Sequence, residues 1–246
     1  MAHLPCLGLL SAEESVRLRQ LSAQFLAGKE FHGAQGLEIT DEVALSIASQ
    51  ACLPLIHWGP DALRWYDDFV SIVVHPGEVV APREATDEAG VVHRWREPLI
   101  GEAMHRGPVM LAWSHVRGGA EEESCGRNLV IHEFAHKLDL RGKGRLAAPD
   151  GCPVLPEGFM GQRSAAAART AWREALMTAH ARFREQVEMS RRFGADAPWM
   201  DAYGATAPEE FFAVSCEAYF VNRERWAQDF PDLLPLFDAF FRPGTR

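Results

Sequence analysis

Two segments near the start of the chain carry apolar residues at helical spacing. The first is predicted to begin at Ser11, where Glu14 stands in the register of a capping box, and to end at Gly28. Its apolar stripe contains Leu18, Leu21 and Phe25. The second follows Thr40 and must end before Pro54, because proline cannot continue a helix. The chain therefore opens with two amphipathic helices.

The pattern changes in the middle of the chain, where short apolar runs bounded by glycine and proline replace the helical spacing. These runs are rich in β-branched and aromatic residues, which favour strands. We predict strands at residues 69–75, 90–95 and 107–116. The third strand is expected either to pair with an extended substrate at the edge of a cleft or to be a plain core strand.

Helical spacing returns from Asn128 onward. One helix is predicted from Asn128 to Gly142, which suits a left-handed cap, and a loop rich in glycine and proline follows at 142–163. Ser164 is expected to begin a long helix whose buried stripe contains Trp172, Leu176, Ala179, Phe183 and Val187. Further helices are predicted after Pro208 and around LLPLFDAFF. Because helices precede and follow the strands instead of alternating with them, the fold class is α+β.

The segment LVIHEFAHKLDL, residues 129–140, places ionisable side chains inside an otherwise apolar helix. His132 and His136 lie on one helix face, so both imidazoles can reach one metal ion at about 2.0–2.1 Å. Glu133 lies beside them and can take a proton from water without binding the metal itself. The alternative is that the histidines are merely buried or surface residues, since HExxH can arise by chance. The apolar helical context favours the metal site.

A catalytic zinc usually has three protein ligands, so a third one is expected. Metzincins take a histidine shortly after HExxH, but Asp139 and Gly142 occupy the positions of their glycine and histidine, so that pattern fails. Asp139 shares a face with the two histidines. It is expected either to accept the outer N–H of a ligand histidine or to be a surface residue of the last turn.

Glutamates of the segment YGATAPEEFFAVSCEAYF are the other source of a third ligand. Thr206 and Glu209 have capping-box spacing, so Glu209 is expected to cap the helix. Glu210 and Glu217 are seven residues apart and share a face, and spacing alone does not choose between them. Whichever of them is not a ligand is either a supporting carboxylate or an exposed helix residue.

The charge balance, the cysteines and the apolar runs of the chain indicate which partners and which cellular compartment to expect. The 246 residues include 25 Lys and Arg against 34 Asp and Glu, a net charge of −9, so nucleic acid is not an expected partner. The five cysteines are widely spaced and contain no CxxC pair, which argues against a disulfide framework. The start lacks the basic residues of a signal peptide, and no apolar stretch reaches the roughly 20 residues of a membrane span. We predict a cytoplasmic protein without a membrane partner.

Several of these segments resemble one known family. VIHEFAHKLD followed by YGATAPEEFFAVSCEAYF is similar to the Mlc titration factor A family of bacterial zinc peptidases, and the resemblance extends over nearly the whole chain. It implies a zincin-like metallopeptidase fold related to the catalytic domain of anthrax lethal factor. In that fold a small antiparallel or mixed sheet accompanies the HExxH helix, and further helices follow. We expect a single domain over 1–246, with N-terminal helices and strands at 1–127 and the zinc-site helices at 128–246.

The resemblance also implies roles for residues. The family has a metal ligand seven residues after a tyrosine, which is Glu210 after Tyr203 in this chain. It therefore implies one Zn²⁺ held by His132, His136 and Glu210, with Glu133 as the base. Tyr203 takes the position of the active-site tyrosine, a donor to the developing oxyanion. The other interpretation of Tyr203 is a buried ring packed beneath the turn that follows it.

The implied activity is gluzincin-type, aminopeptidase-like hydrolysis of short peptides. The best-known member of the family binds the glucose repressor Mlc, so the resemblance also suggests an Mlc-like transcriptional repressor of sugar uptake as a partner. The alternative is a regulatory protein that sequesters such a repressor, with zinc mainly structural. A closed structural zinc site has no use for Glu133, which favours the enzyme. A zinc deformylase or amidase shares the motif, but the spacing of Tyr203 and Glu210 disfavours it.

Overall fold

We describe the protein from a computed structural model. It describes residues 5–86, 92–99, 101–103, 107–117, 125–143 and 148–243, with the side chains of residues 5, 79–86 and 92–99 left aside. The helices and strands follow one another as α1 Pro5–Gly8, α2 Ala12–Gly28, β1 Glu30–Gly33, α3 Asp41–Cys52, β2 Ser71–His75, β3 Val79–Thr86, β4 Val92–Leu99, β5 Gly101–Ala103, β6 Val109–Ala112, α4 Trp113–Val116, α6 Leu129–Leu140, α7 Ala165–Phe193, α8 Pro208–Val221, α9 Arg223–Asp229 and α10 Leu234–Phe241. Short 3₁₀ helices are η1 Leu53–Leu55, η2 Ala62–Tyr66, η3 Phe159–Gly161 and η4 Ala202–Ala205.

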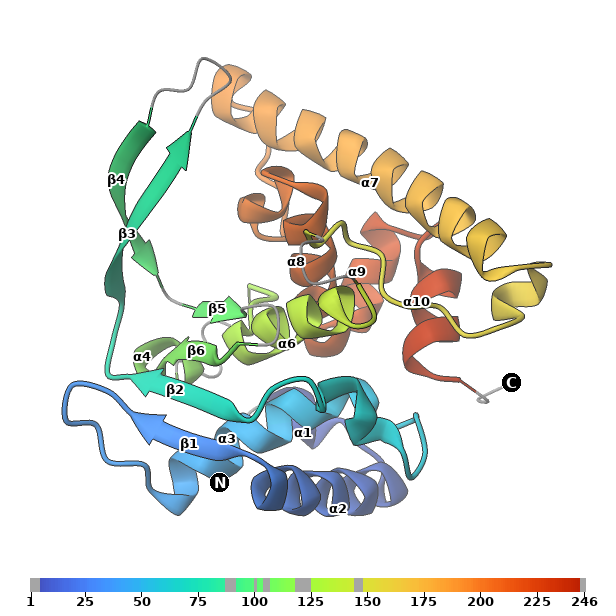
Figure 1. The fold of residues 1–246 in the computed structure, drawn as a ribbon. Helices are drawn as coiled ribbons and strands as arrows, with labels where there is room; N and C mark the ends of the chain where they lie inside the picture. Colours follow the sequence, from blue (N-terminus) through green and yellow to red (C-terminus); the bar gives the residue numbers. More distant parts are fainter. Residues whose placement is uncertain are drawn as a thin grey trace.

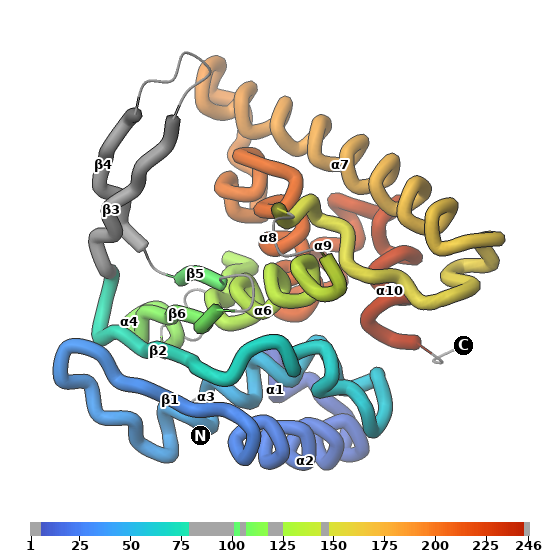
Figure 2. Tube along the Cα trace, in the orientation of Figure 1, coloured from blue at the N-terminus to red at the C-terminus, as the bar shows by residue number. Residues whose placement is uncertain are grey.

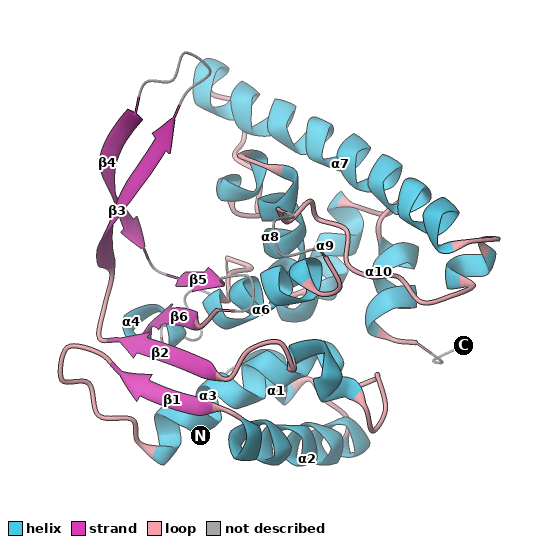
Figure 3. Ribbon diagram, in the orientation of Figure 1, coloured by secondary structure: helices cyan, strands magenta, loops and turns pink. Residues whose placement is uncertain are grey.

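The fold is mixed α+β, as predicted, with one small mixed sheet and a separate hairpin (Figure 1). The sheet has the order β1-β2-β6-β5, in which β1, β2 and β6 are parallel and β5 is antiparallel to β6. Strands β3 and β4 pair only with each other in the described part of the chain. The strands lie on the left of the view in Figure 3, and the long helix α7 crosses its top.

Helix α6 is the central element of the core. It contacts α3, β5, β6 and α8. In Figure 2 the N-terminal elements, drawn in blue, and the C-terminal helices, drawn in orange and red, lie on opposite sides of it. Its buried Phe134 packs its ring against three aromatic rings of the N-terminal half, with centroid distances of 5.7 Å to Phe25, 4.9 Å to Tyr66 and 5.9 Å to Phe69. These edge-on and tilted ring contacts fix the helix against the first half of the chain.

Most of the predicted helix boundaries are confirmed. Ser11 and Glu14 form the reciprocal capping box that begins α2. Asn128 caps α6 through its side chain, and Gly142 follows the helix with a φ of +72°. The predicted apolar stripe of α7 is buried over its whole length, from Trp172 to Val187.

Two sequence predictions were wrong, and some strands were missed. No side chain caps α8, whose N-cap is Ala207, so the capping box with Glu209 does not form. The run at 107–116 is a strand only over Val109–Ala112 and then turns into α4, and this strand lies inside the sheet, between β2 and β5. Strands β1, β3 and β5 were not predicted. Of the run at 90–95, residues 92–95 belong to β4 and the first two lie outside the described residues.

No helix in the described ranges has both the length and the apolar character needed to cross a membrane.

Candidate metal centre

Helix α6 presents its two histidines toward the start of α8. The N-cap carboxamide of Asn128 accepts the N–H of Ile131 at 3.0 Å, which fixes the first turn. The apolar residues of α6 are buried in the core, so the face with His132 and His136 is left to meet α8. Glu210 lies in the first turn of α8 and reaches that face.

The three side chains converge on one point. Glu210 Oε2 lies 3.2 Å from Nε2 of His132 and 3.3 Å from Nε2 of His136. The two Nε2 atoms are 3.2 Å apart. In the described part of the chain these residues are also the one group of histidine, cysteine and acidic side chains arranged to hold a metal ion. Each of the three atoms can offer a lone pair to the same point.

The size of this triangle suits a metal ion. In a tetrahedral zinc site with ligands at about 2.0–2.1 Å, any two ligand atoms are about 3.3–3.4 Å apart. The three observed separations are 3.2, 3.2 and 3.3 Å. Two nitrogens and a carboxylate oxygen are also a usual donor set for a catalytic metal with one open position. The residues therefore fit a divalent cation without rearrangement.

Glu217 orients the first histidine. Its Oε2 accepts the backbone N–H of Asn128 at 2.5 Å, and its Oε1 accepts Nδ1–H of His132 at 2.7 Å. With its proton on Nδ1, a neutral His132 directs the lone pair of Nε2 toward Glu210. Glu217 is buried, so the interpretation of an exposed helix residue is wrong. Glu217 supports a histidine, whereas Glu210 faces both of them.

Charges within the cluster shift its pKa values. Burial alone would raise the pKa of Glu210, but hydrogen bonds from His132 and His136 outweigh it and lower the pKa to about 2. Burial opposes the charge of His132 as well, yet the carboxylates of Glu217 and Glu210 raise its pKa well above the usual value. The site therefore attracts positive charge, and a proton and a metal ion compete for it.

Glu133 lies beside the cluster of His132, His136 and Glu210 and is buried from solvent. Burial, together with the charges of Glu210 and Glu217, raises its pKa to about 7 against the opposing effect of the two histidines. Its Oε2 is buried and has no hydrogen-bond partner among the described residues. A carboxylate with a pKa near neutrality can both take up and release a proton at physiological pH.

The carboxylate of Glu133 packs against the backbone of β5. A Cβ atom built on Gly101 would lie 2.2 Å from Glu133 Oε1 and 2.8 Å from its Cγ, so no larger residue fits there with this conformation of Glu133. Strand β5 is one of the two edge strands of the sheet, the position considered above for residues 107–116. A strand of three residues has no periodic pattern, so nothing in the sequence marked Gly101 as part of the site.

Tyr203 lies close to the cluster and is half exposed. Its ring centroid is 6.1 Å from that of His132, and 51% of the residue is accessible. The carboxylate of Asp201 accepts its backbone N–H at 2.9 Å and so begins η4, the turn that leads into α8. The interpretation of Tyr203 as a buried core ring is therefore wrong, and all five predicted site residues lie in one region.

Asp139 differs from both of its predicted interpretations. It is fully buried, so it is not a surface residue. Its Oδ2 accepts the backbone N–H groups of Asp150 at 2.9 Å and Gly151 at 2.8 Å, so this oxygen bonds the loop that follows α6. The histidine-supporting position considered for Asp139 belongs to Glu217.

Fold and site together are those of a zincin-like metallopeptidase, and a metal ion is the expected cofactor of the His132, His136 and Glu210 triad. The chain belongs to the family of glucose-regulated metallo-peptidases M90, which matches residues 1–242. The resemblance seen in the sequence is thereby confirmed.

Curated relatives named Mlc titration factor A match nearly the whole chain. The protein of Klebsiella pneumoniae subsp. pneumoniae is 34% identical over 239 residues, 97% of this chain and 83% of its own length. Those of Salmonella arizonae and Escherichia fergusonii are 34% identical over 245 and 238 residues, which is 99% and 97% of this chain and 90% and 82% of their lengths.

The geometry ranks three glutamates by their effect on metal binding. Glu210→Ala removes a converging oxygen and is expected to abolish stoichiometric binding. Glu217→Gln keeps the shape but weakens the support of His132, so the affinity should fall about 10–100-fold. Glu209→Ala should leave it unchanged. Titration of the metal-free protein with zinc against a chromophoric chelator measures all three, and retention of full affinity by Glu210→Ala would contradict the assignment.

Proposed function

We propose that this metallopeptidase is a zinc enzyme in which His132, His136 and Glu210 bind the metal and Glu133 and Tyr203 take part in catalysis. The observation that carries the proposal is the triangle of three lone-pair donors, with separations of 3.2–3.3 Å, beside a buried carboxylate. A nitrogen, nitrogen and oxygen donor set of this size suits zinc. We also propose that residues 1–246 act as one domain, since buried residues of both halves form one hydrophobic cluster.

The roles of the chain's own residues follow from their positions. When bound, zinc would polarise the scissile carbonyl and acidify the attacking water. Glu133 accepts the proton of that water and later returns it to the leaving amine, which its pKa of about 7 suits. Tyr203, exposed beside His132, donates a hydrogen bond to the oxygen on which negative charge develops.

The substrate that we propose is a short peptide, hydrolysed in an aminopeptidase-like reaction of the gluzincin type. The edge strand β5 supports this proposal, because an edge strand can pair with an extended peptide, and Gly101 lies directly against Glu133. The pairing would bring the scissile bond close to the base. The test is hydrolysis of aminoacyl p-nitroanilides by the purified protein, with and without a chelator.

A second proposal concerns partner and compartment. The relatives carry the name Mlc titration factor A, and an Mlc-like repressor is the partner that this name supports. The net charge of −9 suits binding to a protein better than binding to DNA. Cys52, Cys152 and Cys216 are buried thiols, which fits a reducing compartment such as the cytoplasm.

Replacement of Glu133 by glutamine separates catalysis from metal binding. Glu133→Gln keeps the shape of the side chain but cannot accept the proton, so hydrolysis should fall by a factor of about 10²–10⁴ while zinc content stays at that of the wild type. Initial rates and metal analysis give the two numbers, with Glu209→Gln as the matched control.

Wild-type rates in Glu133→Gln would refute the mechanism. If neither protein hydrolyses any of the aminoacyl substrates although zinc is bound, the alternative gains support: a regulatory protein that acts through a repressor, with a mainly structural metal.

Gly101 tests the close packing of strand and base. In Gly101→Ala the new methyl group displaces the Glu133 carboxylate, and a misplacement of about 1 Å can cost on the order of 10²-fold in rate. We expect kcat to fall by about that factor with zinc content unchanged. Gly77→Ala is the control, because a Cβ there would meet its nearest neighbour, Ser114 Oγ, at a comfortable 3.8 Å. Unchanged kcat in Gly101→Ala would show that Glu133 does not need this position.

The hydroxyl of Tyr203 is tested by Tyr203→Phe. Loss of one oxyanion donor should lower kcat by about 10²–10³ and change KM much less, because the interaction strengthens as charge develops. Tyr219→Phe is the matched control, since it removes a hydroxyl that donates to Asp238 at 2.7 Å, at the end of α8 away from Glu210. An unaltered kcat on a substrate whose chemistry is rate-limiting would remove Tyr203 from the catalytic residues.

A further inference from the structure

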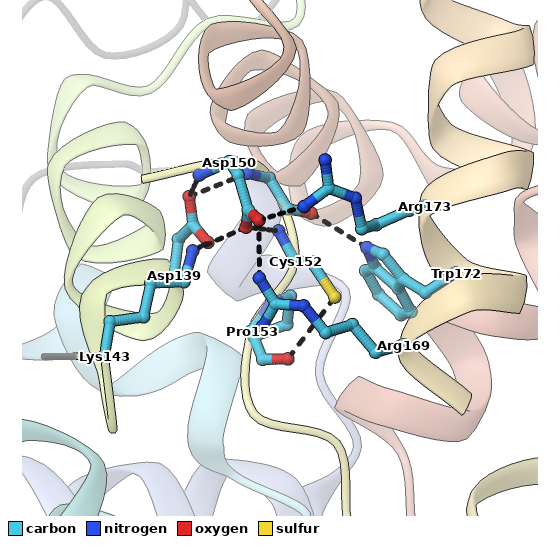
Figure 4. A network of polar contacts seen from close by, with 9 residues as sticks. Asp139, Lys143, Asp150, Cys152, Pro153, Arg169, Trp172 and Arg173 are labelled. Atoms are coloured by element: carbon cyan, nitrogen blue, oxygen red, sulfur yellow. Dashed lines mark hydrogen bonds and ion pairs between the residues drawn. The ribbon is translucent and has the colours of Figure 1, made fainter. Parts of the chain in front are cut away.

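Asp139 is a buried carboxylate one turn beyond the second histidine of α6. Its Oδ2 accepts the N–H groups of Asp150 and Gly151, and its Oδ1 pairs with the ammonium of Lys143 (Figure 4). None of its surface is exposed. A buried carboxylate that bonds two consecutive backbone amides holds the loop to the end of the helix through strong, charge-assisted hydrogen bonds.

Asp150 extends this network to α7. Lys143 Nζ lies 2.6 Å from Asp150 Oδ1, and the guanidinium groups of Arg169 and Arg173 each lie 2.6 Å from Oδ2 (Figure 4). Burial alone would raise the pKa of Asp150, but Lys143 and Arg169 outweigh it and hold the pKa below its usual value. The loop is therefore tied to α6 on one side and to α7 on the other.

Gly151 connects the network to the helix that carries Glu210. Its carbonyl accepts Nε1–H of Trp172 at 2.8 Å. Its φ is +74°, and a Cβ atom there would lie 2.8 Å from the carbonyl oxygen of Pro208 and 3.2 Å from Cβ of Phe212. The loop thus packs directly against the first turn of α8. Glu210 lies between these two contact residues, so the packing of Gly151 bears on the position of its carboxylate.

The opposite end of the helix pair is held differently. Glu217, in the second half of α8, bonds Asn128 and His132 at the start of α6. That contact fixes one end of α8 against α6, and the first turn with Glu210 lies about two helical turns away from it. At the other end of α8, the loop held by Asp139 packs against the first turn through Gly151. The two helices that carry the three metal-facing side chains are therefore joined at both ends.

We propose that Asp139 is a positioning residue, which holds Gly151 against the first turn of α8 and so sets the distance between Glu210 and the two histidines. This inference rests on the proposed function, because it takes the three side chains to be metal ligands. It assigns Asp139 no contact with metal or substrate. It predicts that the affinity for the metal depends on a carboxylate that never touches the ion.

Asp139→Asn is the direct test. The amide has nearly the same shape, but it loses the charge that pairs with Lys143. If its oxygen keeps the two backbone N–H groups, its NH₂ group faces the ammonium of Lys143 as a second donor, so the bonds of the loop are weakened. The zinc affinity of the folded protein should fall about 10–100-fold, measured by competition with a chromophoric chelator. Val43→Ala, a large-to-small change in the core of α3 away from this network, is the control for general loss of stability and should retain wild-type affinity.

A measurement without metal keeps this inference separate from the proposed function. Hydrogen exchange on the metal-free proteins should show faster exchange of the amides in the first turn of α8 in Asp139→Asn, with little change around residue 217. In Val43→Ala any acceleration should be spread over the protein. If the wild type bound no zinc, the proposed function would fail, and the exchange pattern would still decide the role of Asp139.

A milder variant covers the case in which Asp139→Asn does not fold. Arg169→Ala combined with Arg173→Ala removes the two half-exposed partners of Asp150 and leaves the buried carboxylate in place. We expect the zinc affinity to fall about threefold to tenfold, which is less than the fall expected for Asp139→Asn. Wild-type zinc affinity together with wild-type exchange in the first turn of α8, in either variant, would overturn the proposal.

Discussion

The arrangement of α6 and α8 depends on one constraint: three atoms that each offer a lone pair are held close together. Two imidazole nitrogens and a carboxylate oxygen lie within 3.2–3.3 Å of one another, in a region with little access to water. Without a metal ion or a proton shared between them, such an arrangement is unfavourable, because each atom loses hydration and faces another acceptor. The surrounding packing must hold them there. Helix α6 is fixed by aromatic rings on one side and by the buried contacts of Glu217 on the other.

The small sheet borders Glu133, which we propose as the base. Its parallel strands β1, β2 and β6 precede β5 in the sheet order, and the backbone of Gly101 in β5 packs against the carboxylate of Glu133. The two halves of the chain thus divide the chemistry between them. The C-terminal half supplies the converging ligands and the tyrosine, and the N-terminal half supplies the wall that keeps the base dry and raises its pKa.

The sequence predicted those parts of the site that depend on residues close together along the chain, and not those that depend on contacts between distant segments. The pair His132 and His136 follows from helix geometry alone, so the sequence indicated it directly. The choice between Glu210 and Glu217 depends on how α8 packs on α6, a contact between distant segments, and only family resemblance pointed to one of them. Asp139 was misjudged because two of its partners are backbone amides of a later loop, which leave no trace in the sequence. Most predicted helices were right, because capping and periodicity are local.

Gly101 limits which amino-acid substitutions the site can accept during evolution. It has no functional group, and it lies in a strand too short to be recognised by its pattern. Yet every other amino acid would add a carbon atom where the Glu133 carboxylate lies. Any substitution of Gly101 by another amino acid therefore has to displace this carboxylate. A search for functional groups alone would overlook Gly101, because it contributes to the site by leaving room for the side chain of Glu133.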